Sequence, residues 1–274
     1  MKKKGAIGVF DSGYGGLTIL ESLRNKLPEN DFIYLGDNAR TPYGSRSFDV
    51  VYKYTLEAVK FLFNQGCPLV ILACNTASAK ALRSIQQNDL ALLAPENRIL
   101  GVLRPTTEEI GNFTSSKHVG ILGTSGTIKS NSYSIEIKKF FPELTVVQKC
   151  CPMWVPLIEN NEFETTGGDY FIRKYLDEIL AQDDKIDTLV LACTHYPILI
   201  KKITSFIPKG VRVVSQGDLV ASKLEDYLFR HPQMSDRLTK KANLEVLTTE
   251  NSDSFDAVAS GFYSHKIHSK TVQF

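Results

Sequence analysis

Short, continuous apolar runs alternate along the chain with segments whose apolar residues recur at helical spacing. The runs include Ala6 to Phe10, Val70 to Ala73 and Leu189 to Ala192. They are rich in Val, Ile and Leu, which is typical of strands in a parallel sheet that is covered on both faces. Amphipathic stretches such as Phe48 to Phe63 lie between such runs. This alternation predicts an α/β fold with mostly parallel sheets.

Two of the apolar runs occur twice. The stretch Val70 to Thr76 ends in Ala-Cys followed by polar residues, and Leu189 to His195 has the same form. Val119 to Gly126 likewise resembles Ile7 to Gly13, at nearly the same spacing. Two independent pairs of similar segments, separated by nearly the same number of residues, indicate an internal duplication. We therefore expect two pseudo-symmetric three-layer αβα domains with an active site in the cleft between them.

The order of these segments predicts where the two domains begin and end. We assign residues 98–208 to the second domain and residues 1–97 together with 209–274 to a discontinuous first domain. The second domain then starts with a strand from Ile99 to Leu103. The strand Val211 to Val214 and the elements after it return to the first domain. Residues 88–97 are expected to be a turn-like connection.

Composition excludes several function classes. Hydrophobic residues make up 43% and charged residues 23% of the 274 residues, as in ordinary globular proteins. The net charge of +2 gives no argument for nucleic acid, and no run reaches the ~18 apolar residues of a membrane helix. The basic start Met1 to Lys4 precedes an apolar run too short for a signal peptide. With five cysteines and no Cys-x-x-Cys, we expect reduced thiols in the cytoplasm.

Cys74 and Cys193 are the principal candidates for chemistry. Each follows a predicted strand, and ligands of parallel sheets bind at the carboxyl ends of strands. A thiol at a helix N-terminus has a lowered pKa, and the free backbone N–H groups there bind a carboxylate. We expect both thiols to face one cleft. Cys67, Cys150 and Cys151 lack this context and are expected to be structural.

Other polar residues lie at the same predicted edge. Asp11 and Ser12 end the first strand, where Asp11 either binds an ammonium group and assists Cys74 or holds Gly13 in an Asx turn. His195 is a candidate proton-transfer partner of Cys193, or else a packed histidine bonded to the backbone. Gly13, Gly15 and Gly16 do not form a nucleotide-binding motif. The Cys-Thr-His spacing does not fit a structural zinc site, so no metal is expected.

An ordered set of motifs resembles the bacterial glutamate racemases of the aspartate/glutamate racemase superfamily. It extends from about Ala6 to Ala221 and continues loosely to the C-terminus. The motifs are Phe10 to Leu17, Gly36-Asp37 with Pro42-Tyr43-Gly44, Ala73 to Ala77, Gly101-Val102, Gly120 to Thr124 and Ala192 to Pro197. Each motif alone is weak, whereas the ordered set is specific.

The resemblance implies racemisation of L-glutamate to D-glutamate without a cofactor, for peptidoglycan synthesis. It implies that Cys74 and Cys193 act from opposite faces of the α-carbon, with Cys74 on the D side and Cys193 on the L side. Asp11 and His195 are implied to assist the thiols, as is a glutamate that aligns with Glu159, or alternatively Glu162 or Glu164. A homodimer is implied as well. The residues implied to bind substrate are Asp11, Ser12, Tyr43, Gly44, Asn75, Thr76, Thr194 and His195.

Two other functions fit the sequence. One is a sister racemase or isomerase acting on aspartate, hydantoin or maleate, although Tyr43-Gly44 and the Thr-His after Cys193 favour glutamate. The other is a non-catalytic two-domain binding protein, which would tolerate loss of either thiol. The segment Arg104-Pro105-Thr106 departs from the family pattern, in which a small residue often follows the proline. Gln216 receives no role from the sequence.

Overall fold

The computed structural model describes residues 4–274, so Met1 to Lys3 lie outside the described residues. These residues form two sheets in which all paired strands run parallel. The first sheet has the order β10-β9-β2-β1-β3-β4, and the second has the order β6-β5-β7-β8. The strands are β1 (Ile7–Asp11), β2 (Phe32–Gly36), β3 (Leu69–Leu72), β4 (Arg98–Gly101), β5 (His118–Gly123), β6 (Thr145–Cys150), β7 (Thr188–Ala192), β8 (Arg212–Val214), β9 (Leu244–Thr248) and β10 (Ser269–Thr271).

Helices connect the strands and cover the sheets. The two longest, Phe48–Asn64 and Thr166–Leu180, are amphipathic and begin at side-chain caps: Ser47 accepts from the Val50 N–H, and Thr165 accepts from the Gly168 N–H. The α-helices are α1 (Gly16–Lys26), α2 (Phe48–Asn64), α3 (Asn75–Lys80), α4 (Leu82–Ser84), α5 (Leu90–Leu93), α6 (Leu103–Glu109), α7 (Ser125–Lys129), α8 (Ser132–Phe140), α9 (Trp154–Glu159), α10 (Thr166–Leu180), α11 (Ile200–Phe206), α12 (Gly217–Arg230), α13 (Pro232–Ser235) and α14 (Ser252–Ala259). Short 3₁₀ turns are η1 (Asn38–Arg40), η2 (Tyr43–Ser45), η4 (Ile110–Asn112), η5 (Glu162–Glu164) and η6 (Tyr196–Leu199), and η3 (Ile85–Asp89) is a π-helical turn.

The strand order confirms the duplication. Four consecutive strands of the first sheet, β2-β1-β3-β4, repeat as β6-β5-β7-β8 in the second. The strands with similar sequences therefore occupy equivalent positions in the two sheets. β1 corresponds to β5, and β3, which precedes Cys74, corresponds to β7, which precedes Cys193. Only the first sheet is extended, by β9 and β10 beyond β2.

The domain borders lie one strand later than predicted. β4 (Arg98–Gly101), assigned from sequence to the second domain, pairs with β3 in the first sheet. β8 (Arg212–Val214), assigned to the first domain, pairs with β7 in the second sheet. An apolar run indicates a strand but does not indicate which sheet the strand joins. The sequence around β4 and β8 held no turn signal that assigned either strand to one sheet. The strands of the second sheet therefore extend from residue 118 to residue 214.

The connection predicted for residues 88–97 is also partly wrong. The chain remains helical from α4 through the π-helical turn η3 to Leu93, the end of α5. Asp89 lies within this turn and accepts a hydrogen bond from the Tyr52 hydroxyl at 2.6 Å. This tertiary contact satisfies the side chain that otherwise favours a turn.

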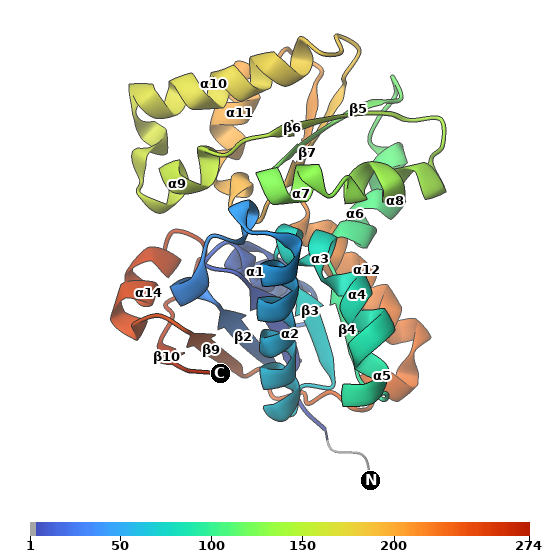
Figure 1. Ribbon diagram of the computed structural model, residues 1–274, viewed down its shortest axis with the longest axis vertical. Helices are drawn as coiled ribbons and strands as arrows, with labels where there is room; N and C mark the ends of the chain where they lie inside the picture. Colours follow the sequence, from blue (N-terminus) through green and yellow to red (C-terminus); the bar gives the residue numbers. More distant parts are fainter. Residues whose placement is uncertain (1–3) are drawn as a thin grey trace.

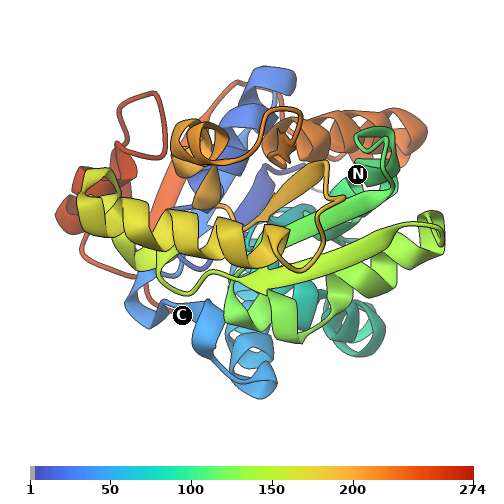
Figure 2. The same cartoon turned by 90° about the horizontal axis from the view of Figure 1, so that it is seen from above.

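Helices cover both faces of each sheet, as expected for three layers. Figure 1 shows the two sheets one above the other, and Figure 2 shows α10 lying across the outer face of the second sheet. α1 and α12 pack against each other on one face of the first sheet, while α2 and α3 lie against the other. One buried cluster contains residues of both sheets, such as Val9 and Leu191, so the two domains share a continuous core.

No helix among residues 4–274 combines the length and the apolar character needed to cross a membrane.

Candidate active site

The carboxyl ends of β3 and β7 open onto one cleft between the domains. Its volume is about 350 Å³, which suits a small molecule. Both Cys74 and Cys193 line it, and they are only 5% and 6% exposed. The charge of Cys193 is close enough to act on the pKa of Cys74. The two thiols therefore lie at the same cleft, as the sequence predicted. The other lining residues are Ser12, Thr41, Pro42, Tyr43, Gly44, Ser45, Asn75, Thr76, Thr124, Ser125, Cys151, Pro152, Val155, Pro156, Glu159, Asn160, Thr194 and His195.

Cys74 lies at the N-terminus of α3, as predicted, and is itself the residue that caps this helix. Its Sγ accepts from the Ala77 N–H at 3.4 Å and lies 3.4 Å from the Ser12 Oγ. The expected lowering of its pKa does not follow. Burial, followed by the Asp11 carboxylate, raises the pKa of Cys74 to about 12, because these effects outweigh the hydrogen bonds with Ser12 and Ala77. In the free protein this group is therefore a thiol at neutral pH.

Cys193 has different surroundings. The prediction that Cys193 lies at a helix N-terminus is wrong, because the chain becomes helical only at Tyr196, in the 3₁₀ turn η6, with His195 at the cap position. Its Sγ lies 4.0 Å from the His195 Nδ1 instead. The two cysteines thus occupy equivalent strand ends but have different partners: a helix N-terminus for one and an imidazole for the other.

His195 links Cys193 to a carboxylate. Its Nε2 lies 2.8 Å from the Glu159 Oε1. Burial disfavours the imidazolium, but the hydrogen bonds to Cys193 and Glu159 together raise the pKa of His195 to about 10. Below that pH both ring nitrogens carry protons, so one faces the Cys193 sulfur while the other donates to Glu159. This arrangement places a fixed positive charge beside the second thiol.

Among the three glutamates considered as helpers, the structure selects Glu159. It lies at the end of α9 and lines the cleft. Glu164 instead forms an ion pair with Lys202 at 3.0 Å, and neither it nor Glu162 lines the cleft. Glu159 reaches the cleft because α9 is directed toward His195. The loose sequence alignment of this segment gave no information about the direction of the helix.

Asp11 lies behind the cleft rather than in it. Its Oδ1 accepts from the Gly13 N–H at 2.9 Å, so the Asx-turn alternative is correct, and its Oδ2 accepts from the Thr194 hydroxyl at 3.3 Å. Burial raises the pKa of this carboxyl, although the nearby His195 charge opposes the change. Asp11 is therefore placed to orient Thr194 and to act electrostatically on Cys74 and His195.

Tyr43 and Gly44 line the cleft from the loop after β2. The Tyr43 hydroxyl donates to Asp37, so its proton is not available to a ligand. Gly44 passes so close to the second domain that a Cβ on it would lie 2.9 Å from the Thr124 Cβ. Thr124 in turn lies 2.9 Å from the Thr76 hydroxyl, oxygen to oxygen. This loop and the α3 N-terminus thus meet the second domain at one side of the cleft.

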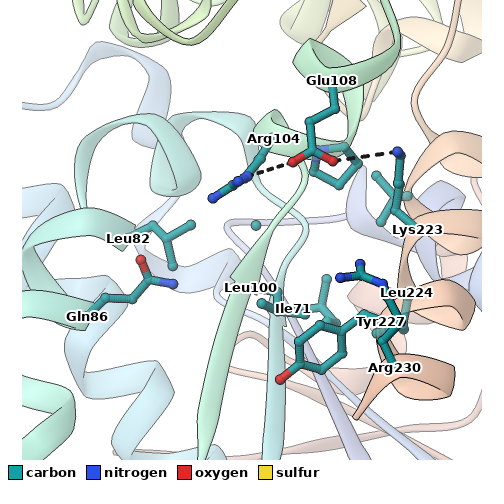
Figure 3. Close-up of a pocket in the computed structure, with 13 residues that line it drawn as sticks. Ile71, Leu82, Gln86, Leu100, Arg104, Glu108, Lys223, Leu224, Tyr227 and Arg230 are labelled. Carbon is teal, nitrogen blue, oxygen red and sulfur yellow. Dashed lines mark hydrogen bonds and ion pairs between the residues drawn. The ribbon is translucent and has the colours of Figure 1, made fainter. Parts of the chain in front are cut away.

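A second cavity, of about 370 Å³, lies between α4, α6 and α12 (Figure 3). Its apolar floor includes Ile71, Leu100 and Leu224. Glu108 on its rim pairs with Arg104 at 2.7 Å and Lys223 at 3.6 Å. No cysteine among the described residues lines this cavity, although it is about as large as the cleft between the domains. The volume of a cavity therefore does not identify the candidate active site. Within residues 4–274, no group of three His, Cys, Asp or Glu side chains is arranged to hold a metal ion.

Comparisons with known proteins agree with this geometry. The family model for Asp/Glu/Hydantoin racemases matches residues 17–224. A glutamate racemase of Geobacter metallireducens is 41% identical over 223 residues, which cover 81% of this chain and 80% of the relative. The chain belongs to the Asp/Glu/Hydantoin racemase family. Its predicted resemblance to glutamate racemases is thereby confirmed.

Solved structures of glutamate racemases share the whole fold of this family member. A crystal structure from Bacillus anthracis matches with a TM-score of 0.88 and 32% identity, covering 99% of this chain and 98% of the other. One from Francisella tularensis, in complex with D-glutamate, matches with a TM-score of 0.87 and 31% identity, covering 98% of each chain. The predicted α/β fold with parallel sheets is confirmed.

Gly15 is a site residue that sequence reasoning missed. A Cβ on Gly15 would lie 2.3 Å from the Thr194 Oγ1 and 2.4 Å from the His195 Nδ1. The cluster of Gly13, Gly15 and Gly16 was the available signal, because glycines commonly mark a close approach of backbone to another group.

We expect Gly15→Ala to lower kcat/KM by about a hundredfold, because the new methyl group must push His195 from Cys193 and misplaced groups lose roughly this factor. Steady-state kinetics of the folded variant provide the measurement. Gly167→Ala is a control, because its Cβ would meet only the Thr165 Oγ1 at 3.7 Å. Wild-type kinetics in Gly15→Ala would contradict the close packing described here.

Proposed function

We propose that this protein interconverts L-glutamate and D-glutamate without a cofactor, using Cys74 and Cys193 as a pair of acid and base. The observation that carries the proposal is that two buried thiols, from equivalent strands of duplicated halves, line one small cleft. Inversion of a stereocentre by proton transfer requires a base on one face of the carbon and an acid on the other. Similarity to glutamate racemases supports glutamate as the substrate.

The reaction moves one proton in each of two steps. The Cys193 thiolate removes the α-proton of L-glutamate; the S–H bond forms, the C–H bond breaks and the electron pair remains on the α-carbon. The Cys74 thiol then gives its proton to the opposite face, which produces D-glutamate and a Cys74 thiolate. The D-to-L direction reverses both steps. The protonated Cys74 of the free protein matches the acid required in the first direction.

Polar groups of the cleft bind the substrate and stabilise the carbanion in this proposal. Asn75 and Thr76 line the cleft and offer donors to the carboxylates, whereas the Thr194 hydroxyl donates to Asp11. His195, whose Nε2 is held by Glu159, places its Nδ1 4.0 Å from the Cys193 sulfur, in position to exchange a proton with that group. Ser12 contacts Cys74, and Asp11 positions Thr194. Tyr43 and Gly44 contribute to the wall of the cleft rather than a hydroxyl group.

Circular dichroism of amino-acid solutions tests the function directly. We expect the ellipticity of L-glutamate to decay to zero with added protein alone, while that of L-aspartate decays about a hundredfold more slowly, since one methylene changes discrimination by roughly ten- to two-hundredfold. A double variant with serine at both cysteines is the control for contaminating activity. A constant ellipticity with glutamate would contradict the proposal, and decay with aspartate instead would identify a sister racemase.

In the cell, we propose that the product D-glutamate is used for peptidoglycan synthesis, that the protein is cytoplasmic and that it is a homodimer. These three points rest on the resemblance to bacterial glutamate racemases. Light scattering coupled to size exclusion measures the mass of the assembly in solution. A mass of one chain, against 30.6 kDa from sequence, would contradict the homodimer.

A further inference from the structure

Gln216 is a buried carboxamide at the point where the chain passes from β8 into α12, and it is 2% exposed. Its Oε1 accepts from the Asn75 Nδ2 at 2.7 Å. Its Nε2 donates to the Tyr133 hydroxyl at 2.7 Å and to the Thr106 Oγ1 at 2.8 Å, and lies 3.3 Å from the Val102 carbonyl oxygen. One side chain thus joins α3 of the first domain, α8 of the second and the segment that follows β4.

Three of these side chains form a closed ring of hydrogen bonds. Asn75 donates to Gln216, Gln216 donates to Tyr133, and the Tyr133 hydroxyl donates back to the Asn75 Oδ1 at 2.6 Å. All three residues are buried. In such a ring, each amide uses its oxygen and the N–H on the same side. The remaining N–H of each amide points away from the ring.

The segment after β4 sets the direction of the ring. The remaining Gln216 N–H meets the Thr106 Oγ1, whose own hydrogen is donated to the Val102 carbonyl at 3.1 Å. With the ring reversed, the Gln216 oxygen would face the Val102 carbonyl oxygen, two acceptors 3.3 Å apart with no hydrogen between them. Thr106, the residue that departs from the family pattern, is therefore part of what orients Gln216.

We propose that Gln216 is a positioning residue that fixes the Asn75 amide so that its remaining N–H points into the cleft as a donor to a substrate carboxylate. Asn75 lines the cleft next to Cys74. Within the ring, the Asn75 Oδ1 accepts from Tyr133 and one Asn75 N–H donates to Gln216, so one N–H of Asn75 remains. A freely rotating amide would present its oxygen to an anion half of the time. The ring excludes that orientation. This inference rests on the proposed function, because it assigns one donor of that same site.

The ring also ties substrate binding to the arrangement of the domains. Asn75 belongs to the first domain and Tyr133 to the second, while Val102 and Gln216 lie at the two places where the chain crosses between them. Figure 1 shows α3, α6, α8 and α12 converging on the same side of the molecule, between the two sheets. The Asn75 amide is therefore oriented only when both domains hold their partners in place.

Kinetics of Gln216→Met and Tyr133→Phe test the proposal. Each variant keeps the shape of the side chain but opens the ring. We expect KM for L-glutamate to rise about tenfold in each, with kcat within about threefold, because an interaction shared by ground and transition states is lost. The double variant should show about the same KM as either single variant, since the three side chains act as a unit.

Thr107→Val is the matched control. Thr107 is as buried as its neighbour Thr106, but its hydroxyl donates only to the Arg104 carbonyl, so KM should stay at the wild-type value. Calorimetric titration with D-glutamate supplies a second readout that needs no turnover. Wild-type KM and affinity in folded Gln216→Met and Tyr133→Phe would overturn the positioning role while leaving racemisation intact. A wild-type protein that neither racemises nor binds glutamate would instead overturn the proposed function.

Discussion

Replacement of either Cys74 or Cys193 by serine is expected to lower racemisation of glutamate by about a thousandfold or more in both directions, within the range attributed to a positioned acid or base. A serine hydroxyl is a far weaker acid than a thiol, so it neither accepts the α-proton as a base nor returns one at a useful rate. Because each thiol serves a different face of the substrate, neither compensates for loss of the other.

Two measurements separate the roles of the thiols. Circular dichroism reports racemisation, and proton NMR in heavy water reports exchange at the α-carbon. We expect Cys74→Ser to exchange L-glutamate only and Cys193→Ser to exchange D-glutamate only, because one base remains in each variant. Cys150→Ser is the control, since Cys150 is half-buried and does not line the cleft. A single-serine variant that racemises at the wild-type rate would contradict the two-thiol mechanism.

Glu159→Gln is expected to lower kcat/KM by about thirtyfold, within the range of general acid–base effects, and to alter its pH dependence. In the native protein the pKa of His195 is raised to about 10 by Cys193 and Glu159. The imidazolium beside Cys193 is therefore kept up to that pH, and activity should fall as the pH rises through about 10. Loss of the Glu159 carboxylate lowers the pKa of His195, so the alkaline fall should begin at lower pH in the variant.

The same pair also makes stability depend on pH. The pKa of His195 is higher in the folded protein than its ordinary value of 6.5, so the stabilisation is complete below 6.5 and is lost as pH rises through about 10. Chemical denaturation of wild type and Glu159→Gln across this window measures the difference. Glu162→Gln and Glu164→Gln are matched controls with wild-type kinetics. A shifted pH profile in either control, with none in Glu159→Gln, would assign the helper role elsewhere.

The sequence predicted the features that depend on local pattern and repetition. The matching Ala-Cys runs located both thiols at strand ends, and the glycine echo between β1 and β5 supported two equivalent halves. It did not locate the borders, because β4 and β8 read as ordinary apolar strands whichever sheet they join. Nor did it select Glu159, since that choice depends on how α9 is directed toward His195.

Electrostatic and network properties required three-dimensional packing. The position of Cys74 before a helix predicted a lowered pKa, but burial and the Asp11 carboxylate act in the opposite direction and are larger. The sequence assigned no role to Gln216, because its partners lie in segments far apart along the chain. Tyr43 matched a substrate-binding motif, but the sequence did not show that its hydroxyl donates its proton to Asp37.

The two crossings between the domains limit how substrate enters and leaves. After β4 and after β8 the chain passes from one domain to the other, and the contact between Gln216 and Val102 brings these passages within 3.3 Å. Because the two connections are adjacent, they act as a single hinge at one edge of the domain interface. We therefore expect the cleft to open by rotation about this hinge and to close with both thiols again lining it.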